Sequence, residues 1–278
     1  MPSLILEGGT FRPIFTAGVL DALLDNNITF PYCIGVSAGI TNGVSYISKQ
    51  RGRNLEVLIK YRNDKKYFGY GNFIKCKSIF GLDFVFDEIP NKLVPFDMDT
   101  YRKYDGKILI GVTNAKTGKT EYLDGKYLDD KATMLRATCA LPIFFPVIKI
   151  NNNEYYDGGI CDPIPIKKAI TDGNEKHLII LTQPKGYKKY LSKKNVLVSK
   201  LLCNKYPNLK NSFLTRHDHY NETIKFCEDL ENQGKAIILR PEYPLESFEK
   251  DVNKLKSNYE HGYELATKHL TKINSLFN

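Results

Sequence analysis

The sequence predicts an α/β fold in which a mainly parallel sheet is flanked by helices. Two short apolar segments near the N-terminus, residues 3–7 (SLILE) and 32–35 (YCIG), are each followed by a turn and a helical pattern. The clearest buried strand of the second half is formed by residues 176–184 (KHLIILTQP). Strands that alternate with helices in this way are typical of parallel sheets covered by helices.

The other elements follow from hydrophobic periodicity and turn residues. Apolar side chains recur at helical spacing over residues 11–24, and residues 38–48 predict a second helix. Farther along, KILIGVTNAKTG and KTEYLDG predict two strands joined by a turn, and residues 130–141 predict a helix that ends at Pro142. Residues 245–277 have the pattern of a polar amphipathic helix pair.

The chain shows no internal repeat and no low-complexity linker. Its character changes after the last predicted strand, because residues 185–205 contain seven lysines and no acidic residue. We therefore expect one domain over residues 1–278. In this domain a helical, basic portion (186–278) packs on the motif-bearing part (3–185).

The composition is that of an ordinary globular protein with a basic surface. Hydrophobic residues make up 42% of the 278 residues, and 40 Lys and Arg against 31 Asp and Glu give a net charge of +9. Such a charge fits an anionic membrane surface, nucleic acid, or merely a basic surface. No nucleic-acid-binding motif accompanies the lysines, so we expect no nucleic-acid partner.

Six cysteines, at positions 33, 76, 139, 161, 203 and 227, form no Cys-x-x-Cys pair and no zinc-like cluster, so no metal is expected. The first residues do not have the pattern of a signal peptide, and no apolar run approaches the ~18 residues that span a bilayer. These features predict a reduced cytoplasmic protein that touches a membrane at most peripherally.

The segment GVSAG (35–39) has the Gly-x-Ser-x-Gly pattern of a nucleophile elbow. Gly35 and Gly39 would allow a sharp strand-to-helix turn that exposes Ser37, and the helix N-terminus would face a developing oxyanion. The alternative is an ordinary turn in which Ser37 only caps the helix. A second strand-to-helix turn, EGGTFRP (7–13), either exposes backbone N–H groups for an anion or is merely a tight turn.

The proton acceptor for Ser37 is less obvious. We expect His177 to be a strand residue, and His261 and His269 to be solvated on a polar helix. His217 and His219, in the predicted loop TRHDHYNE, are the histidine candidates for a catalytic triad. Another candidate is Asp157 in YYDGGICDPIP, where Gly158 and Gly159 follow and permit close backbone approach.

Four motifs in this order, EGGTFR, GVSAG, RATCALPIFFP and DGG, resemble those of the patatin-like phospholipases of the bacterial branch. The four together are far more specific than any one alone. The resemblance implies a three-layer α/β/α sandwich of patatin-like fold, a Ser-Asp dyad, no catalytic histidine and no cofactor.

Carried over residue by residue, the resemblance makes Ser37 the nucleophile and Asp157 its base. Gly8, Gly9 and the backbone of Thr10 become the oxyanion hole, with Arg12 supporting that loop. Two departures from the family pattern stand out, Thr10 in place of a third glycine and Pro13 after the arginine.

The resulting expectation is a serine acyl hydrolase of lipid esters, of phospholipase A or lysophospholipase type, that works through an acyl-enzyme. A thioesterase or generic carboxylesterase with the same dyad, and a catalytically silent lipid-binding protein, are the alternatives. Residues 73–89 are either a lid or acyl-chain wall or an ordinary core helix plus strand. In residues 185–205, Leu191, Val198, Leu201 and Leu202 would share one face of an interfacial helix or of a solvated surface helix.

Overall fold

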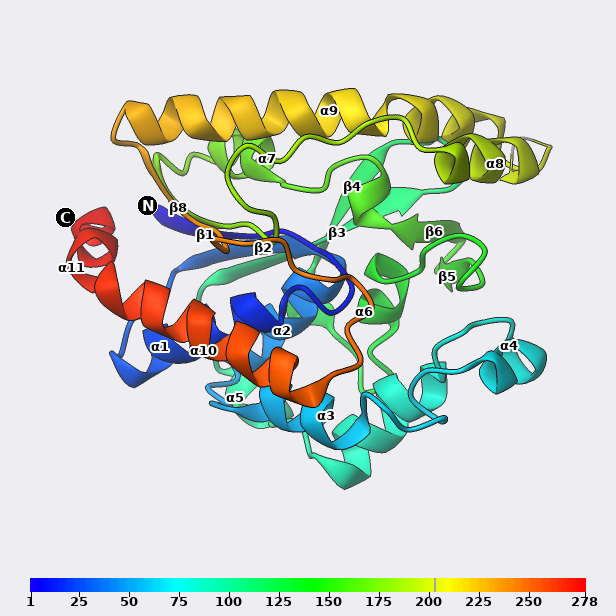
Figure 1. Ribbon diagram of the computed structural model, residues 1–278, viewed down its shortest axis with the longest axis horizontal. Helices are drawn as coiled ribbons and strands as arrows, with labels where there is room; N and C mark the ends of the chain where they lie inside the picture. The colour runs from blue at the N-terminus through cyan, green and yellow to red at the C-terminus, as the bar shows by residue number, and fades with distance from the viewer. Residues whose placement is uncertain (203) are drawn as a thin grey trace.

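The computed structural model describes residues 1–202 and 204–278 (Figure 1). Its described part contains an eight-stranded mixed sheet in which the strands on the main path are ordered β5-β6-β3-β2-β1-β7-β8, with β4 paired to β3. The strands are β1 (Pro2–Leu6), β2 (Tyr32–Val36), β3 (Lys107–Asn114), β4 (Thr120–Asp124), β5 (Ile148–Ile150), β6 (Asn153–Asp157), β7 (Lys176–Ile180) and β8 (Ala236–Leu239).

The centre of the sheet is parallel, as the sequence predicts. Strand β1 pairs with β2 and β7, β2 pairs with β3, and β7 pairs with β8, all in parallel register. Only the edge that contains β4, β5 and β6 is antiparallel. The carboxyl ends of β1 and β2 therefore lie side by side, where Leu6 pairs with Gly35. Loops that leave these two ends must meet, and they contain the two glycine motifs.

Helices cover both faces of the sheet (Figure 1). Beneath it in this view lie α1 (Ile14–Asp25), α2 (Ser37–Ile47), α3 (Arg53–Tyr61) and α10 (Val252–Lys268), and above it lie α7 (Ile166–Thr171) and α9 (Pro207–Asn232). The other helical segments are α4 (Tyr70–Cys76), α5 (Met98–Arg102), α6 (Thr133–Thr138), α8 (Lys193–Leu202), α11 (Leu270–Asn274) and the short η1 (Phe84–Leu93), η2 (Gly125–Tyr127), η3 (Gly158–Ile160) and η4 (Ser275–Phe277).

The alternation of side chains along each strand builds two separate cores. In β1, Leu4 and Leu6 pack with Phe15 of α1 and Ile40 of α2 on one face. The intervening Ile5 packs on the other face with α7 and with α9, where Tyr220 is fully buried. The predicted three-layer α/β/α arrangement is confirmed.

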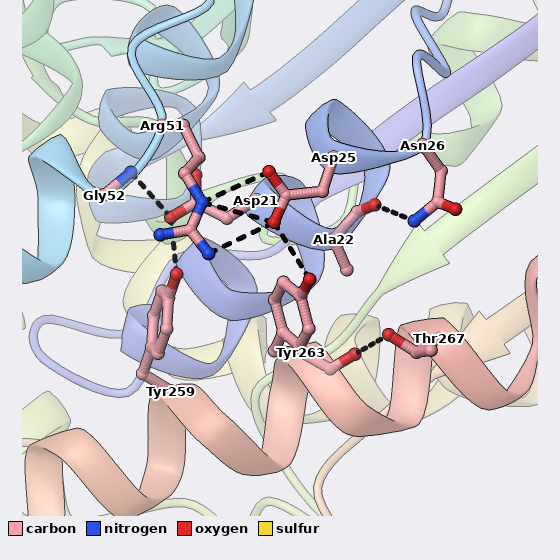
Figure 2. A network of polar contacts seen from close by, with 9 residues as sticks. All are labelled: Asp21, Ala22, Asp25, Asn26, Arg51, Gly52, Tyr259, Tyr263 and Thr267. Carbon is pink, nitrogen blue, oxygen red and sulfur yellow. Dashed lines mark hydrogen bonds and ion pairs between the residues drawn. The ribbon is translucent and has the colours of Figure 1, made fainter.

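The C-terminal helix α10 is joined tightly to the N-terminal helix α1 (Figure 2). The Tyr259 hydroxyl donates a 2.7 Å hydrogen bond to the buried Asp21, and the Tyr263 hydroxyl donates one of 2.9 Å to Asp25. The two backbones approach closely at Gly18, where a Cβ atom would lie 1.9 Å from the Tyr259 carbonyl oxygen. The segment that follows β8 therefore completes the same layer as α1.

Three local expectations were wrong. The predicted loop TRHDHYNE lies inside α9, a 26-residue helix that continues through it because its apolar residues pack on the sheet. Residues 73–89 contain no strand; they run from the end of α4 into the π-helical segment η1, which includes Pro90. In α8, Val198 is buried whereas Leu201 is exposed and Leu191 precedes the helix, so these residues do not share one face.

The cysteines at positions 33, 76, 139, 161 and 227 are free thiols, and Cys203 lies outside the described residues. Across residues 1–202 and 204–278, no helix combines the length and apolar character needed to cross a membrane. Nor does this part of the chain contain a group of three or more His, Cys, Asp or Glu side chains able to hold a metal ion.

Candidate active site

Ser37 stands at the turn between β2 and α2. Its backbone has a φ of 53°, a left-handed conformation that is uncommon for a residue with a side chain. Its N–H donates to the Thr138 hydroxyl at 2.8 Å, and that hydroxyl donates to the Gly111 carbonyl at 2.6 Å. These two bonds tie the strained turn to β3. Strain of this kind persists only where the surroundings hold it in place.

Both glycines of the Gly-x-Ser-x-Gly motif lie against the end of β1. A Cβ atom at Gly35 would lie 2.7 Å from the Leu6 Cβ, and one at Gly39 would lie 2.4 Å from the Glu7 carbonyl oxygen. A side chain at either position would force the first turn of α2 away from β1. The motif therefore places Ser37 beside the loop that follows β1.

Asp157 ends β6 and is fixed by its backbone. Its N–H donates to the Ala140 carbonyl and its carbonyl accepts from the Thr113 hydroxyl, both at 2.9 Å. The carboxylate accepts a 2.7 Å hydrogen bond from the Gly159 N–H, and Asp157 lines the same cavity as Ser37. The structure thus brings Ser37 and Asp157 together in the wall of one cavity across 120 residues of sequence.

Burial raises the pKa of the Asp157 carboxyl to about 6. The hydrogen bonds from Ser37 and Gly159, together with the positive charge of Arg216, oppose this rise. Asp157 as a whole is only 3% exposed. A carboxylate whose pKa lies near 6 is a better proton acceptor than an ordinary aspartate and is still ionised at neutral pH.

The loop after β1 places Gly8, Gly9 and Thr10 next to Ser37. A Cβ atom at Gly8 would lie 2.9 Å from the Cβ of Ser37. In the described part of the chain, the backbone N–H groups of these three residues have no acceptor. Thr10 has a φ of 59°, so it adopts the left-handed conformation that a glycine would adopt there.

Arg12 folds back over this loop. Its guanidinium donates to the hydroxyl of Thr182 at 3.4 Å and to that of Ser247, and a Cβ atom at Gly9 would lie 2.9 Å from it. The Phe11 N–H donates to the Ser247 carbonyl at 3.2 Å. The loop is therefore held by the segment that follows β7 and by the segment before α10.

Two cavities meet at Ser37, and Thr10 and Leu141 also line both. The first, of about 200 Å³, is mostly apolar and its walls include Phe80, Val85, Phe86 and Ile89. The second, of about 250 Å³, is more polar and also contains Asp157, together with the cationic residues Arg12, Lys189, Lys194 and Arg216.

The histidines lie elsewhere. Neither His217 nor His219 lines either cavity, and the His217 Nε2 lies 3.3 Å from the Asp218 carboxylate. His177 is a strand residue that shares a 2.7 Å hydrogen bond with Ser3, and burial lowers its pKa to about 4. His261 stacks on Tyr243 at 5.1 Å. The conventional triad that the sequence left open has no histidine at Ser37.

Sequence reasoning missed Thr138, Lys189 and Arg216. The sequence could have indicated Thr138, since it lies in the motif RATCALPIFFP. Arg216 had none, because it faces the site from a helix that follows the recognised motifs by many residues. Its Nε donates to the Gly159 carbonyl at 2.7 Å, beside Asp157.

Comparisons with known proteins agree with the motifs. A family model described as patatin-like phospholipase matches residues 4–170, and one described as "Domain of unknown function (DUF6363)" matches residues 206–278. The "Uncharacterized protein YjjU" of Escherichia coli K12 is 30% identical over 188 residues, which are 66% of this chain and 52% of that protein.

The "Probable lipid hydrolase 463L" of Invertebrate iridescent virus 6 is 26% identical over 193 residues, 63% of this chain and 65% of that protein. The chain thus spans about half to two thirds of the length of these curated relatives. Among solved structures, VipD from Legionella pneumophila superposes with a TM-score of 0.43 at 13% identity, covering 96% of this chain and 67% of VipD. Since the patatin-like phospholipase model matches more than half of the chain, the chain belongs to that family.

Proposed function

We propose that this protein hydrolyses acyl esters of lipids, with Ser37 as nucleophile and Asp157 as general base. The observation that supports this most strongly is the position of Ser37 beside the buried Asp157 in the more polar cavity, at the point where this cavity meets the apolar one. Membership of the patatin-like phospholipase family supplies the substrate class.

In the first half-reaction, the Ser37 oxygen attacks the ester carbonyl carbon while Asp157 accepts the hydroxyl proton. The carbonyl oxygen becomes an oxyanion, which the free N–H groups of Gly8, Gly9 and Thr10 are placed to stabilise. When the carbon–oxygen bond to the alcohol breaks, Asp157 returns the proton to the departing alcohol. An acyl group then remains on Ser37.

In the second half-reaction, water attacks the acyl carbon and gives a proton to Asp157. The tetrahedral intermediate collapses, the proton returns to the Ser37 oxygen, and a fatty acid leaves. Each half-reaction balances without a further reactant.

The apolar cavity is suited to the acyl chain. Aromatic and aliphatic side chains from residues 80–89 form one of its walls. Of the two interpretations of residues 73–89, this supports the one in which they contact the acyl chain. The same dyad would serve a thioesterase or a generic carboxylesterase, but a cavity of this character favours a long acyl group. A silent lipid-binding protein is disfavoured because Thr10 adopts the conformation expected of the glycine it replaces.

Contact with an anionic membrane is a further part of the proposal. Exposed apolar side chains on α4 (Tyr70, Ile74) and α8 (Leu197, Leu201) stand among lysines. Phe144, in the loop between α6 and β5, contacts both regions. Its carbonyl accepts a 3.1 Å hydrogen bond from the Ile79 N–H, shortly after α4, and its ring lies 4.1 Å from the Lys194 ammonium in α8. Apolar residues ringed by lysines favour an anionic lipid surface.

We also propose that residues 1–278 form one domain. Strand β8 extends the central sheet beyond β7, and α10 packs along α1, so the C-terminal part shares both the sheet and the core.

The direct test uses a serine-reactive fluorophosphonate and a chromogenic long-chain ester. Ser37→Ala is expected to abolish both labelling and hydrolysis, and Asp157→Asn to abolish hydrolysis. The matched control is Asp162→Asn, which changes a partly buried aspartate that accepts a hydrogen bond from Tyr122 and lines neither cavity. Full activity in Ser37→Ala or Asp157→Asn, or a loss in His219→Ala alone, would contradict the dyad.

A further inference from the structure

The more polar cavity beside Ser37 is lined by more positive than negative side chains. Its cations are Arg12, Lys189, Lys194 and Arg216, and its acids are Glu7 and Asp157. These cations come from three separate regions: the loop after β1, the segment around the start of α8, and the first half of α9. Three distant segments therefore direct positive charge into one space next to the nucleophile.

These cations have only neutral partners in the described part of the chain. Arg216 donates to the Gly159 carbonyl, Arg12 donates to two hydroxyl groups, and the Lys189 ammonium lies 3.4 Å from the centre of the Tyr220 ring. Within residues 1–202 and 204–278, none of the four forms an ion pair with a carboxylate. Their charge is therefore not compensated at close range.

Lys189 and Arg216 are each partly buried, and desolvation acts on both. Burial lowers the pKa of both Lys189 and Arg216, and the charge of Arg216 lowers that of Lys189 further. Glu7, an acid of the same cavity, already accepts a hydrogen bond of 2.7 Å from the Thr182 N–H. Four cations share this cavity with only two carboxylates, so positive charge is in excess there, and a bound anion would offset it.

We infer that Lys189 and Arg216 form a subsite for an anionic group, a phosphate monoester in the first instance, in the alcohol part of the substrate. This inference rests on the proposed function, because it assigns the second cavity to the part of the ester that leaves first. Residues 189 and 216 both follow the segment matched by the patatin-like phospholipase model, so that match assigns them no role.

The direction of binding follows from the two cavities. The scissile carbonyl must lie at Ser37, where the cavities meet, and the acyl chain fits the apolar one. The alcohol part then enters the cavity that contains Lys189 and Arg216. Arg216 donates a hydrogen bond to the Gly159 carbonyl, and its positive charge lowers the pKa of the Asp157 carboxyl. An anionic group bound to Arg216 would therefore lie only a few bonds from the ester oxygen. The predicted preference is for acyl esters of phosphorylated alcohols over their neutral counterparts.

The first experiment measures binding without turnover. The Ser37→Ala protein is titrated calorimetrically with two ether lipids of equal chain length, an alkylglycerol phosphate and an alkylglycerol. We expect the phosphate to bind at least about tenfold more tightly, and added salt to reduce this advantage. The advantage should disappear when Lys189→Met or Arg216→Gln is added, and persist when Lys210→Met is added. Lys210 is the matched control, since it is exposed on the same helix and lines neither cavity.

The outcomes separate the sources of the anion. Equal affinity for the two ether lipids, or an advantage that survives Lys189→Met, would overturn the inference. Inorganic phosphate should displace the alkylglycerol phosphate. If inorganic phosphate bound while the two ether lipids remained equal, the site would take free phosphate and the head-group assignment would be wrong. Arg216→Gln also removes the hydrogen bond to the Gly159 carbonyl. If this variant fails to fold, Lys189→Met alone provides the test.

The second experiment measures turnover. The ratio of kcat/KM for a monoacylglycerol phosphate to that for the monoacylglycerol should fall at least about tenfold in Lys189→Met and stay constant in Lys210→Met. Hydrolysis of the neutral ester that depends on Ser37, with no preference for the phosphate, would overturn the subsite alone. Absence of hydrolysis with the binding preference intact would overturn the proposed function alone.

Discussion

Replacing Asp157 by Asn should stabilise the fold while it removes activity. Burial raises the pKa of this carboxyl from 3.8 to about 6, which corresponds to about 3 kcal/mol. The folded protein therefore holds a proton that the unfolded chain has lost between these two values, so the free energy of unfolding falls as pH rises through this window. Asparagine keeps the shape and the acceptor for the Gly159 N–H but has no charge to bury.

The magnitude can be followed with pH. Because neutral aspartic acid resembles asparagine, the variant gains as Asp157 ionises: about 1 kcal/mol at pH 4.5 and about 3 kcal/mol at pH 7. Urea unfolding at several pH values between 4.5 and 8 measures this difference directly. In a thermal melt at pH 7 the gain corresponds to about 6–10 °C.

The matched control is Ser37→Ala, which also removes activity but leaves the carboxyl in place. It should keep a free energy of unfolding that falls as pH rises, over a window that extends further upward because Ser37 no longer lowers the pKa of Asp157, whereas Asp157→Asn should lose this pH dependence. If Asp157→Asn were less stable than the wild type at pH 7, or if the difference did not grow with pH, the carboxyl would not be a destabilised buried base.

The same pKa makes kcat/KM rise with pH to a plateau, with a midpoint near 6, and a flat profile from pH 5 to 8 would contradict Asp157 as base. Thr138→Val leaves the buried N–H of Ser37 without its acceptor, so it should lower the free energy of unfolding in urea by about 1–3 kcal/mol and also lower kcat. An unchanged free energy of unfolding would refute the tie to β3. Thr10→Gly relieves a left-handed threonine and should raise the free energy of unfolding by about 1 kcal/mol with hydrolysis retained, so loss of hydrolysis would show that the side chain itself is needed. Gly39→Ala should abolish hydrolysis, because its Cβ would meet the Glu7 carbonyl, whereas Gly71→Ala, with open space around it, should be active.

Local patterns in the sequence were enough to predict the core of the fold. The strands that became β1, β2, β3 and β7, and the helices α1 and α2, were predicted because their apolar residues follow helical or strand periodicity. Residues 207–232 were not recognised as one helix. This helix has only scattered buried residues, and its length depends on the sheet it covers.

For the candidate site, the sequence supplied the residue types and their order. It predicted Ser37, Asp157 and the loop Gly8–Arg12, and the structure brings these residues together. The tie from Thr138 to Ser37 and the contacts of Arg216 and Lys189 depend on segments separated by many residues. No local pattern encodes such contacts.

The sequence by itself therefore determined an α/β chain of the patatin-like family with a serine at a strand-to-helix turn, since periodicity and turn chemistry are local properties. Only the tertiary structure decided how far burial raises the pKa of Asp157 and which distant cations line the cavity beside Ser37. The physical reason is that desolvation and charge proximity depend on how the whole chain packs.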